Sequence, residues 1–324
     1  MPSGENTMSS VLELPNAIPE LTQDEFRFFQ ELVLNESGIH LGAKNRAMLI
    51  ARLWKRLRAL DLTSFSSYYR LVKKDPAEMV HMLDCICTNE THFFREPTAF
   101  TCLRERVFPE WIISADAGRR PRTIRAWSAA CSTGEEPYSL AMTLLAHFPE
   151  EVGWKIEVLG TDLSTKVLAR ASTGIWTAEK IATIPVEYQR RFLLKGFGPD
   201  KGKYKAADEL RRVVRFQRLN LNQENYEMFG PFDLIFCRNV IIYFQWETKL
   251  RVINQLGSHL APHGYLFLGH AESVHGVSEK LESVAPKVFR SADGKTNSTY
   301  CILQRRKAVR RTLQTTTVSN EESA

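Results

Sequence analysis

The sequence predicts an α/β protein of two domains, in which a small all-helical unit precedes a parallel sheet covered by helices. Three observations predict this architecture. The length of 324 residues exceeds what one small core requires and suits roughly two domains. Helical periodicity fills residues 21–85, and strand-like segments alternate with helix-like segments from residue 122 onward.

The first domain is expected to span residues 21–90. Thr22 stands as a cap before an acidic first turn, and Phe26 opens an apolar run at helical spacing. A break at Ser37-Gly38 ends this helix. Three more helices are expected after it, at residues 43–60, 65–73 and 77–87. Nothing in this stretch alternates with period two, so the unit is predicted to be all-helical.

The segments that flank this domain have their own signatures. Residues 1–20 contain proline and glutamate and lack the charged-then-apolar layout of a signal peptide, so a flexible N-terminus is expected. Residues 91–121 are expected to link the two domains through a helix at about 100–113. Residues 305–324 are basic and then rich in Thr, Ser and Glu, which is typical of a disordered tail.

The second domain is expected to span residues 122–304. Short strands are expected at residues 123–128, 155–161, 232–237 and 264–269. Helices are expected at residues 135–148, from 164 onward and at 246–260. The glycine-rich residues 196–202 interrupt this alternation between short strand-like runs, which predicts an antiparallel β-subdomain near residues 190–218. Ligands of such parallel sheets bind at the carboxyl ends of the strands.

The composition excludes several classes of protein. Hydrophobic residues make up 44% and charged residues 25%, as in an ordinary globular protein, and no apolar run approaches the ~20 residues that span a bilayer. The six cysteines show no Cys-x-x-Cys motif and no paired Cys/His spacing, which argues against a zinc site or a disulfide framework. Reduced thiols in a cytoplasm are therefore expected. The net charge of +6 is compatible with an acidic partner.

The loop after the first expected strand has features of a ligand site. Small residues from Ser128 to Gly134 let backbone N–H groups approach a ligand closely, and the glycine and lysine pattern of a phosphate loop is missing. Glu135 and Glu136 open the following helix and suit a cationic ligand, such as one with an α-amino or sulfonium group. The alternative is that both glutamates only complement the helix dipole.

Two further strand ends carry polar residues. Asp162 closes the second strand and could accept hydrogen bonds from ribose hydroxyls, or it could cap the following helix. Arg238 and Asn239 follow the apolar strand at 232–237, where Arg238 read singly would be a surface residue. Asn220 would lie near an adenine under the same sheet geometry. Together the three strand ends favour a nucleoside ligand that bears a positive charge.

Four segments resemble the chemotaxis receptor methyltransferases, the CheR family. The resemblance runs from about Leu21 to Gln304, with the motifs in the family's order and spacing. The segments are residues 88–96 (TNETHFFRE), 128–138 (SAACSTGEEPY), 236–244 (FCRNVIIYF) and 264–273 (GYLFLGHAES). One departure from the wider methyltransferase class, a small-residue loop in place of Gly-x-Gly-x-Gly, is shared by the family.

The resemblance implies a class I S-adenosylmethionine-dependent methyltransferase (Rossmann-like) sheet with a small N-terminal helical domain and an inserted antiparallel β-subdomain. It implies S-adenosyl-L-methionine as cofactor and S-adenosyl-L-homocysteine as product. Carried over by position, the residues that reach the cofactor are Asn89, Thr91, Arg95, Glu135 or Glu136, Asp162, Asn220, Leu221, Arg238 and Asn239. Arg95 and Tyr243 are expected near the transferable methyl group, as the catalytic residues.

The implied reaction moves a methyl group from the sulfonium to a receptor glutamate. A glutamate of pKa about 4.3 is already ionised at neutral pH, so no general base is required. We expect Arg95 to orient the acceptor carboxylate through a charge-assisted hydrogen bond, and Tyr243 to shape the methyl slot or bond the same carboxylate. His92 is expected to be a packed or solvent-facing residue and not a base.

The expected partner is the cytoplasmic helical bundle of chemoreceptors. Arg52, Lys55 and Arg56 share one face of a helix in a stretch, residues 38–59, that contains no acidic residue, although such runs are usually solvated faces. The insertion at 196–205 keeps a Gly-x-Gly turn and could hold a receptor C-terminal tail peptide by strand addition. A cytoplasmic monomer without nucleic acid and without membrane insertion is expected.

Two rival functions stay open from the residues alone. A nucleic-acid methyltransferase would share the fold, but the chain lacks the Asn/Asp-Pro-Pro-aromatic loop used for base amination, and Cys131 and Cys237 form no recognisable catalytic pair. A non-catalytic signalling protein with this fold is the other. The presence of Arg95, Asp162 and Tyr243 argues against that reading.

Overall fold

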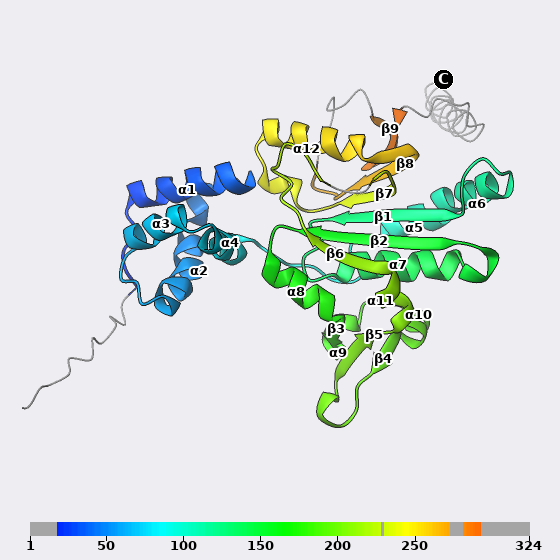
Figure 1. Ribbon diagram of the computed structural model, residues 1–324, viewed down its shortest axis with the longest axis horizontal. Coiled ribbons are helices and arrows are strands. Elements are labelled where there is room, and N and C mark those ends of the chain that lie inside the picture. Colours follow the sequence, from blue (N-terminus) through cyan, green and yellow to red (C-terminus); the bar gives the residue numbers. More distant parts are fainter. Residues whose placement is uncertain (1–17, 228–229, 273–280, 293–324) are drawn as a thin grey trace, which may run out of the picture.

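The structure is a computed structural model that describes residues 18–227, 230–272 and 281–292. A helical domain lies beside a larger domain built on a sheet, and a thin linker joins the two (Figure 1). The expected tails at 1–17 and 305–324, and the end of the second domain at 293–304, lie outside the described residues.

The helical domain contains four α-helices and one 3₁₀ turn within the described residues. They are α1 (Gln23–Ser37), the turn η1 (Ala43–Asn45), α2 (Arg46–Ala59), α3 (Phe65–Lys74) and α4 (Pro76–Ile86). The capping box at the start of α1 is present, because Thr22 Oγ1 accepts from the N–H of Glu25 at 3.2 Å and the Glu25 carboxylate accepts from the N–H of Thr22 at 2.8 Å. Phe29 and Tyr68 lie in the core of this domain. The four predicted helices are thus confirmed.

The linker leads into a continuous helical stretch. It comprises α5 (Pro97–Cys102), the π-helical segment η2 (Leu103–Val107) and α6 (Phe108–Asp116). The predicted helix at 100–113 corresponds to this stretch. Phe100, Phe108 and Trp111 turn inward and join the larger core of the sheet domain, which fixes the linker to one face of the sheet.

The main sheet has seven strands in the order β6-β2-β1-β7-β8-β10-β9. Its strands are β1 (Thr123–Ala129), β2 (Lys155–Asp162), β6 (Val214–Arg218), β7 (Phe232–Cys237), β8 (Leu260–Leu268), β9 (Leu281–Ala285) and β10 (Val288–Ser291). The pairs among β6, β2, β1, β7 and β8 are parallel, and β10 runs antiparallel to both of its neighbours. This arrangement confirms the predicted α/β fold.

Helices cover both faces of this sheet. The helix α12 (Trp246–Ser258) lies on one side, and α7 (Glu135–His147) and α8 (Thr165–Thr173) lie on the other (Figure 1). Each side has its own buried core: Leu140 and Phe236 belong to the core on the α7 side, and Trp127 and Ile253 belong to the core on the α12 side. The sheet is therefore apolar on both faces, and the polar residues of interest lie at its edge.

The inserted β-subdomain starts earlier and ends earlier than predicted. It has three antiparallel strands in the order β3-β5-β4, with β3 (Ile175–Thr177), β4 (Leu193–Lys195) and β5 (Lys203–Ala206). Short helices lie between β3 and β4 and after β5: α9 (Ala178–Ile181), α10 (Val186–Phe192) and α11 (Asp208–Val213). The predicted range near 190–218 missed β3, which has only three residues, and included residues 214–218, which form β6 of the main sheet.

Candidate active site

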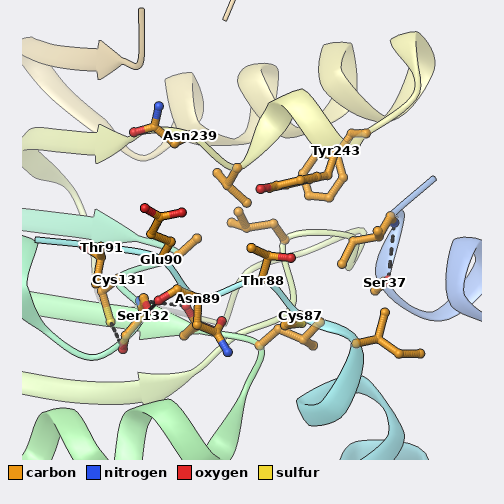
Figure 2. Close-up of a pocket in the computed structure, with 18 of the residues that line it drawn as sticks. Ser37, Cys87, Thr88, Asn89, Glu90, Thr91, Cys131, Ser132, Asn239 and Tyr243 are labelled. Atoms are coloured by element: carbon orange, nitrogen blue, oxygen red, sulfur yellow. Dashed lines mark hydrogen bonds between the residues drawn. The ribbon is translucent and has the colours of Figure 1, made fainter. Parts of the chain in front are cut away.

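A cavity lies at the carboxyl edge of the main sheet, between the two domains. Its wall comes from the segment after α1, the linker, the loop after β1 and the ends of β2, β6 and β7. Figure 2 shows the linker residues Asn89 and Thr91 between Ser132 on one side and Asn239 and Tyr243 on the other. The sheet thus brings together residues that stand far apart in the sequence.

The strand register explains this convergence. Ala129, the last residue of β1, pairs with Thr161 on β2 and with Cys237 on β7. The next residue of β2 is Asp162, and the residue after β7 is Arg238, so both lie at the same edge as the loop that follows β1. The strands that follow β1 are added first on one side of it, as β2 and β6, and then on its other side, as β7 and β8. Parallel sheets bind ligands at such switch points in strand order.

Asp162 joins the ends of β1 and β2. One of its carboxylate oxygens accepts from the backbone N–H of Ser132 at 2.8 Å, and the other accepts from the N–H of Ser164 at 2.9 Å. Burial raises the pKa of Asp162, although these backbone donors oppose the shift. The interpretation as a helix cap is wrong, because Ser164 is the N-cap of α8. Asp162 lines the cavity, and because the two oxygens of a carboxylate offer about four acceptor positions, it can accept a further hydrogen bond there.

The two neighbouring glutamates at the start of α7 point to different places. Glu136 lines the cavity, where its carboxylate accepts from Ser128 Oγ at 2.7 Å and pairs with Arg238 Nη1 at 3.1 Å. Glu135 lies outside the cavity wall, with its side chain 1% exposed and its carboxylate 3.5 Å from Lys180 Nζ. Burial raises the pKa of Glu136, and the charge of Arg238 opposes that shift.

Arg238 is buried, and the interpretation as a surface residue is wrong. Its side chain is 1% exposed and lies between two carboxylates, with Glu96 at 3.0 Å and Glu136 at 3.1 Å. It also donates to the backbone carbonyl of Arg95. Three carboxylates and two guanidinium groups line the cavity, so its wall carries a net negative charge, which suits a cationic ligand and disfavours a phosphate.

The linker residues lie along one wall of the cavity. Asn89, Thr91 and Arg95 all line it. The backbone carbonyl of Asn89 accepts from Ser132 Oγ at 2.9 Å, and Arg95 Nη1 donates to the carbonyl of Glu90 at 3.0 Å. The first contact ties the linker to the loop after β1, and the second joins two residues within the linker. They leave the side chains of Asn89 and Thr91 among the lining groups.

His92 stands apart from this wall. Its side chain is exposed and is not part of the cavity lining. Burial, together with the nearby charge of Arg95, lowers its pKa. The expectation that His92 is not a base in the site fits this placement.

Asn220 and Leu221 line the cavity from the end of β6. Asn220 Nδ2 donates to the carbonyl of Glu36 at 2.6 Å, which ties the sheet edge to the end of α1. Tyr243 lines the cavity from the segment after β7, with 38% of its surface exposed, so it lies at the mouth. Its backbone carbonyl accepts from the N–H of His40 at 2.8 Å. The helical domain therefore closes one side of the cavity.

Sequence reasoning missed several residues of this site. Glu96 lies within a quoted motif, yet no role was assigned to it, and its partners are far away in the sequence. The segment after α1, with Ile39, His40 and Leu41, also lines the cavity. No local signal distinguishes these residues from an ordinary interhelical loop, so only the packing of the two domains reveals them.

The basic face of α2 turns largely inward. Arg56 forms two hydrogen bonds with the Glu78 carboxylate, at 2.8 and 2.5 Å, and Tyr68 donates to the same carboxylate at 2.8 Å. Arg52 donates to the backbone carbonyl of Ile86 and to Thr88 Oγ1. Lys55 is exposed. Two of the three residues expected to dock a receptor thus also hold the domain together.

Across the described ranges, no group of three or more His, Cys, Asp or Glu side chains is placed to hold a metal ion. Among the helices of the described part of the chain, none combines the length and apolar character needed to cross a bilayer. A parallel sheet with an anionic cavity at its switch point, lined by an acidic residue at the end of β2, is the arrangement of a protein that binds a nucleotide cofactor.

Comparison with known proteins places the chain within this class. Residues 89–289 match the family model described as CheR methyltransferase, SAM binding domain, and residues 24–87 match the CheR methyltransferase all-alpha domain. The chain belongs to the CheR methyltransferase family. Its larger domain is an S-adenosylmethionine-binding methyltransferase domain, as the resemblance predicted.

The chain is also similar in sequence to curated chemotaxis protein methyltransferases over most of their length. Chemotaxis protein methyltransferase 2 of Pseudomonas aeruginosa is 35% identical over 274 residues, which covers 84% of this chain and 94% of that protein. The chemotaxis protein methyltransferase of Klebsiella aerogenes is 38% identical and covers 83% of this chain and 90% of that protein. The chemotaxis protein methyltransferase of Escherichia coli is 38% identical and covers 78% of this chain and 85% of that protein. PKMT2 from Rickettsia typhi, solved with AdoHcy, aligns over 45% of this chain and 21% of that chain, with 19% identity and a TM-score of 0.29, too low to carry an argument.

Proposed function

We propose that this protein is a protein-glutamate O-methyltransferase of chemotaxis. It transfers a methyl group from S-adenosyl-L-methionine to the side-chain carboxylates of specific glutamates on methyl-accepting chemotaxis receptors, and it yields glutamate methyl esters and S-adenosyl-L-homocysteine. The observation that carries the proposal is the anionic cavity at the ends of β1, β2 and β7, in a chain whose curated relatives are chemotaxis protein methyltransferases.

The residues of the cavity fit the cofactor. Asp162, which lines the cavity, would accept hydrogen bonds from the ribose hydroxyls, and Glu136, in place of Glu135, would hold the cationic methionine end. Asn220 and Leu221 would flank the adenine. The remaining contacts are assigned to Asn89, Thr91, Arg95, Arg238 and Asn239. When bound, the cofactor supplies an activated methyl group on a sulfonium.

The chain's own work in the reaction is positioning. An ionised glutamate of pKa about 4.3 is already a nucleophile at neutral pH. Arg95 would orient that carboxylate by a charge-assisted hydrogen bond, and Tyr243, at the mouth, would border the methyl slot. Holding the reactants together in a site closed against water can supply ~7–11 kcal/mol of the barrier.

The receptor would approach from the side of the helical domain. Lys55 is exposed on α2, and Arg52 and Arg56 are half-buried on the same face, which suits an acidic helical bundle. A receptor tail peptide could add to the edge strand β4, beside the exposed Leu194 and Phe197. We propose that the enzyme acts as a monomer at the cytoplasmic part of the receptor.

One experiment separates this function from its rivals. The purified protein is incubated with radiolabelled S-adenosylmethionine, receptor-containing membranes and, in parallel, DNA and RNA. We expect label in the receptor that is released as methanol by mild base, because methyl esters are base-labile. Base-stable label in nucleic acid would support a nucleic-acid methyltransferase, and no transfer to any acceptor would support a non-catalytic protein.

A further inference from the structure

The segment after β7 carries much of the site, and two carboxylates outside the cavity hold it. This active-site segment is residues 238–243, which include Arg238, Asn239 and Tyr243 of the cavity wall. Glu96 of the linker and Glu272 of the loop after β8 contact the segment but are not among the cavity-lining residues. Neither has a part in the reaction proposed above.

Glu272 binds the backbone of this segment. It is 2% exposed, and one of its carboxylate oxygens accepts from the N–H of Val240 at 2.9 Å and from the N–H of Ile241 at 3.0 Å. The other oxygen accepts from the N–H of Gly269 at 2.5 Å. A buried carboxylate is costly unless it is hydrogen-bonded, and here backbone donors supply that compensation. Glu272 therefore joins the loop after β8 to the segment after β7.

The backbone at this junction is unusual and closely packed. Asn239 has a φ of 60°, in the left-handed region that few non-glycine residues adopt and in which asparagine is enriched. A Cβ on Gly269 would lie 2.9 Å from the backbone nitrogen of Asn239. The two loops are thus in contact without an intervening side chain. The N–H groups that follow Asn239 are the ones that Glu272 accepts from, so its carboxylate stabilises this left-handed turn.

Glu96 binds the side chains of the same segment. One of its carboxylate oxygens pairs with Arg238 at 3.0 Å, and the other accepts from Asn239 Nδ2 at 3.1 Å and from the N–H of His270 at 3.4 Å. Glu96 thus holds the side chains and Glu272 holds the backbone of one short stretch. Tyr243 follows within one turn of Ile241, so its placement depends on the same stretch.

We propose that Glu272 is a positioning residue for methyl transfer. Its carboxylate fixes the backbone of residues 239–241, and through that backbone it holds Asn239 against the cofactor and Tyr243 at the mouth. Glu96 completes the arrangement from the linker side. The inference rests on the proposed function in that Asn239 and Tyr243 are taken as cofactor and methyl-slot residues.

The test replaces Glu272 by glutamine. Glutamine keeps one acceptor oxygen but turns an NH₂ group toward an N–H donor, so at least one of the three hydrogen bonds is lost. We expect the Kd for S-adenosylhomocysteine, measured by calorimetry, to rise about tenfold, and kcat to fall by a similar factor. The KM for receptor should stay within about twofold, and amide exchange should quicken at Val240 and Ile241.

A matched control separates positioning from general stability. Glu110→Gln removes the charge of a carboxylate on α6 that accepts from Tyr265 at 2.7 Å and pairs with Arg290 at 2.6 Å. Both partners are on strands of the main sheet, and none of the three residues lines the cavity. This variant should lower Tm without changing Kd or the exchange of Val240. Glu272→Asp keeps the charge on a shorter side chain and serves as the second variant if the glutamine variant does not fold; it should show the same direction of change.

Three outcomes of these experiments decide whether Glu272 is a positioning residue. A folded Glu272→Gln or Glu272→Asp variant with wild-type Kd and kcat would overturn the proposal, and so would exchange that quickens evenly across the sheet. Selective exchange at residues 239–241 together with a raised Kd would support it. If the wild-type protein does not methylate receptors, the proposed function fails, whereas Kd and amide exchange still test the positioning role.

Discussion

Two arginines of this protein form internal ion pairs in different charge environments, one in the helical domain and one at the cavity. Arg56 faces a single buried carboxylate, Glu78, which also accepts from Tyr68. Burial works to raise the pKa of Glu78, yet the hydrogen bonds from Arg56 and Tyr68 hold that pKa below its ordinary value. The charges balance, and the cluster pins α2 to α3 and α4.

Arg238 faces two carboxylates, Glu96 and Glu136, and is left outnumbered. Here burial raises the pKa of Glu136; the charge of Arg238 opposes this shift, and the negative charge of Glu96 adds to it. A balanced buried pair is compensated within the protein, whereas we propose that a cationic ligand compensates the excess negative charge beside the cavity. The comparison distinguishes a stabilising cluster from a binding one, although both consist of arginine and glutamate.

The largest effects are expected from removing each arginine. Arg238→Ala leaves two neighbouring carboxylates without a cation, so methyl transfer should fall by about 100-fold or more in kcat/KM. Arg56→Ala leaves the carboxylate of Glu78 buried without its cation and should lower the free energy of unfolding by about 3 kcal/mol. Cofactor binding, measured by calorimetry, should be lost in the first variant and kept in the second. An Arg56→Ala variant of normal stability but no cofactor affinity would reverse the two assignments.

The neighbouring glutamates of α7 give the next largest contrast. Glu136→Gln removes the charge that faces the cavity, so the Kd for S-adenosylmethionine should rise about tenfold. Glu135→Gln changes a carboxylate that faces Lys180 and should leave Kd within about twofold. Calorimetric titration of both variants checks this. An equal rise in Kd in the two variants would show that the combined charge at the start of α7, and not one side chain, attracts the cofactor.

The clusters around Arg238 and Arg56 should also lose their charged carboxylates at different pH values. The raised pKa of Glu136 means that its carboxylate protonates above the ordinary glutamate value, so cofactor affinity should decline several-fold as the pH falls toward that value. The lowered pKa of Glu78 contributes stability that is present above its unfolded value of about 4.3 and is lost only as the pH falls through the lower folded value. Calorimetry and circular dichroism on one pH series check the order. Unfolding that precedes the loss of affinity would contradict it.

The smallest effect is expected at the exposed part of α2. Lys55→Glu should raise the KM for receptor a few-fold, chiefly through slower association, and leave kcat and cofactor Kd unchanged. Arg104→Glu makes the same change of charge at an exposed position of η2 and should alter none of these values. Receptor methylation rates at low ionic strength measure both. Identical KM values for the two variants would remove α2 from the docking surface.

The sequence was sufficient for the elements whose signals are local. The helix cap at Thr22, the helix that begins near Ser164, the apolar strand at Phe232–Cys237 and the polar strand ends were all identifiable, because periodicity and capping involve neighbours in the chain. Asp162 was placed correctly at the sheet edge for the same reason. The short strand β3 was missed, since three residues carry too little periodicity.

What could not be predicted depends on contacts between distant residues. The partner of Arg238, Glu96, is 142 positions away, so Arg238 read alone resembles a surface residue. Glu135 and Glu136 are adjacent, and only the orientation of α7 decides which one faces the cavity. The inward turn of Arg56 likewise depends on Glu78, which lies 22 positions later on another helix.

The most direct test of the account is a crystal structure of the protein with S-adenosylhomocysteine. The account predicts the ribose hydroxyls on Asp162, the amino-acid end beside Glu136 and the adenine between Asn220 and Leu221. The Arg238 guanidinium should remain between its two carboxylates. A ligand bound elsewhere, or one in this cavity that makes no polar contact with Glu136 and Asp162, would contradict the assignment of the anionic cavity as the cofactor site.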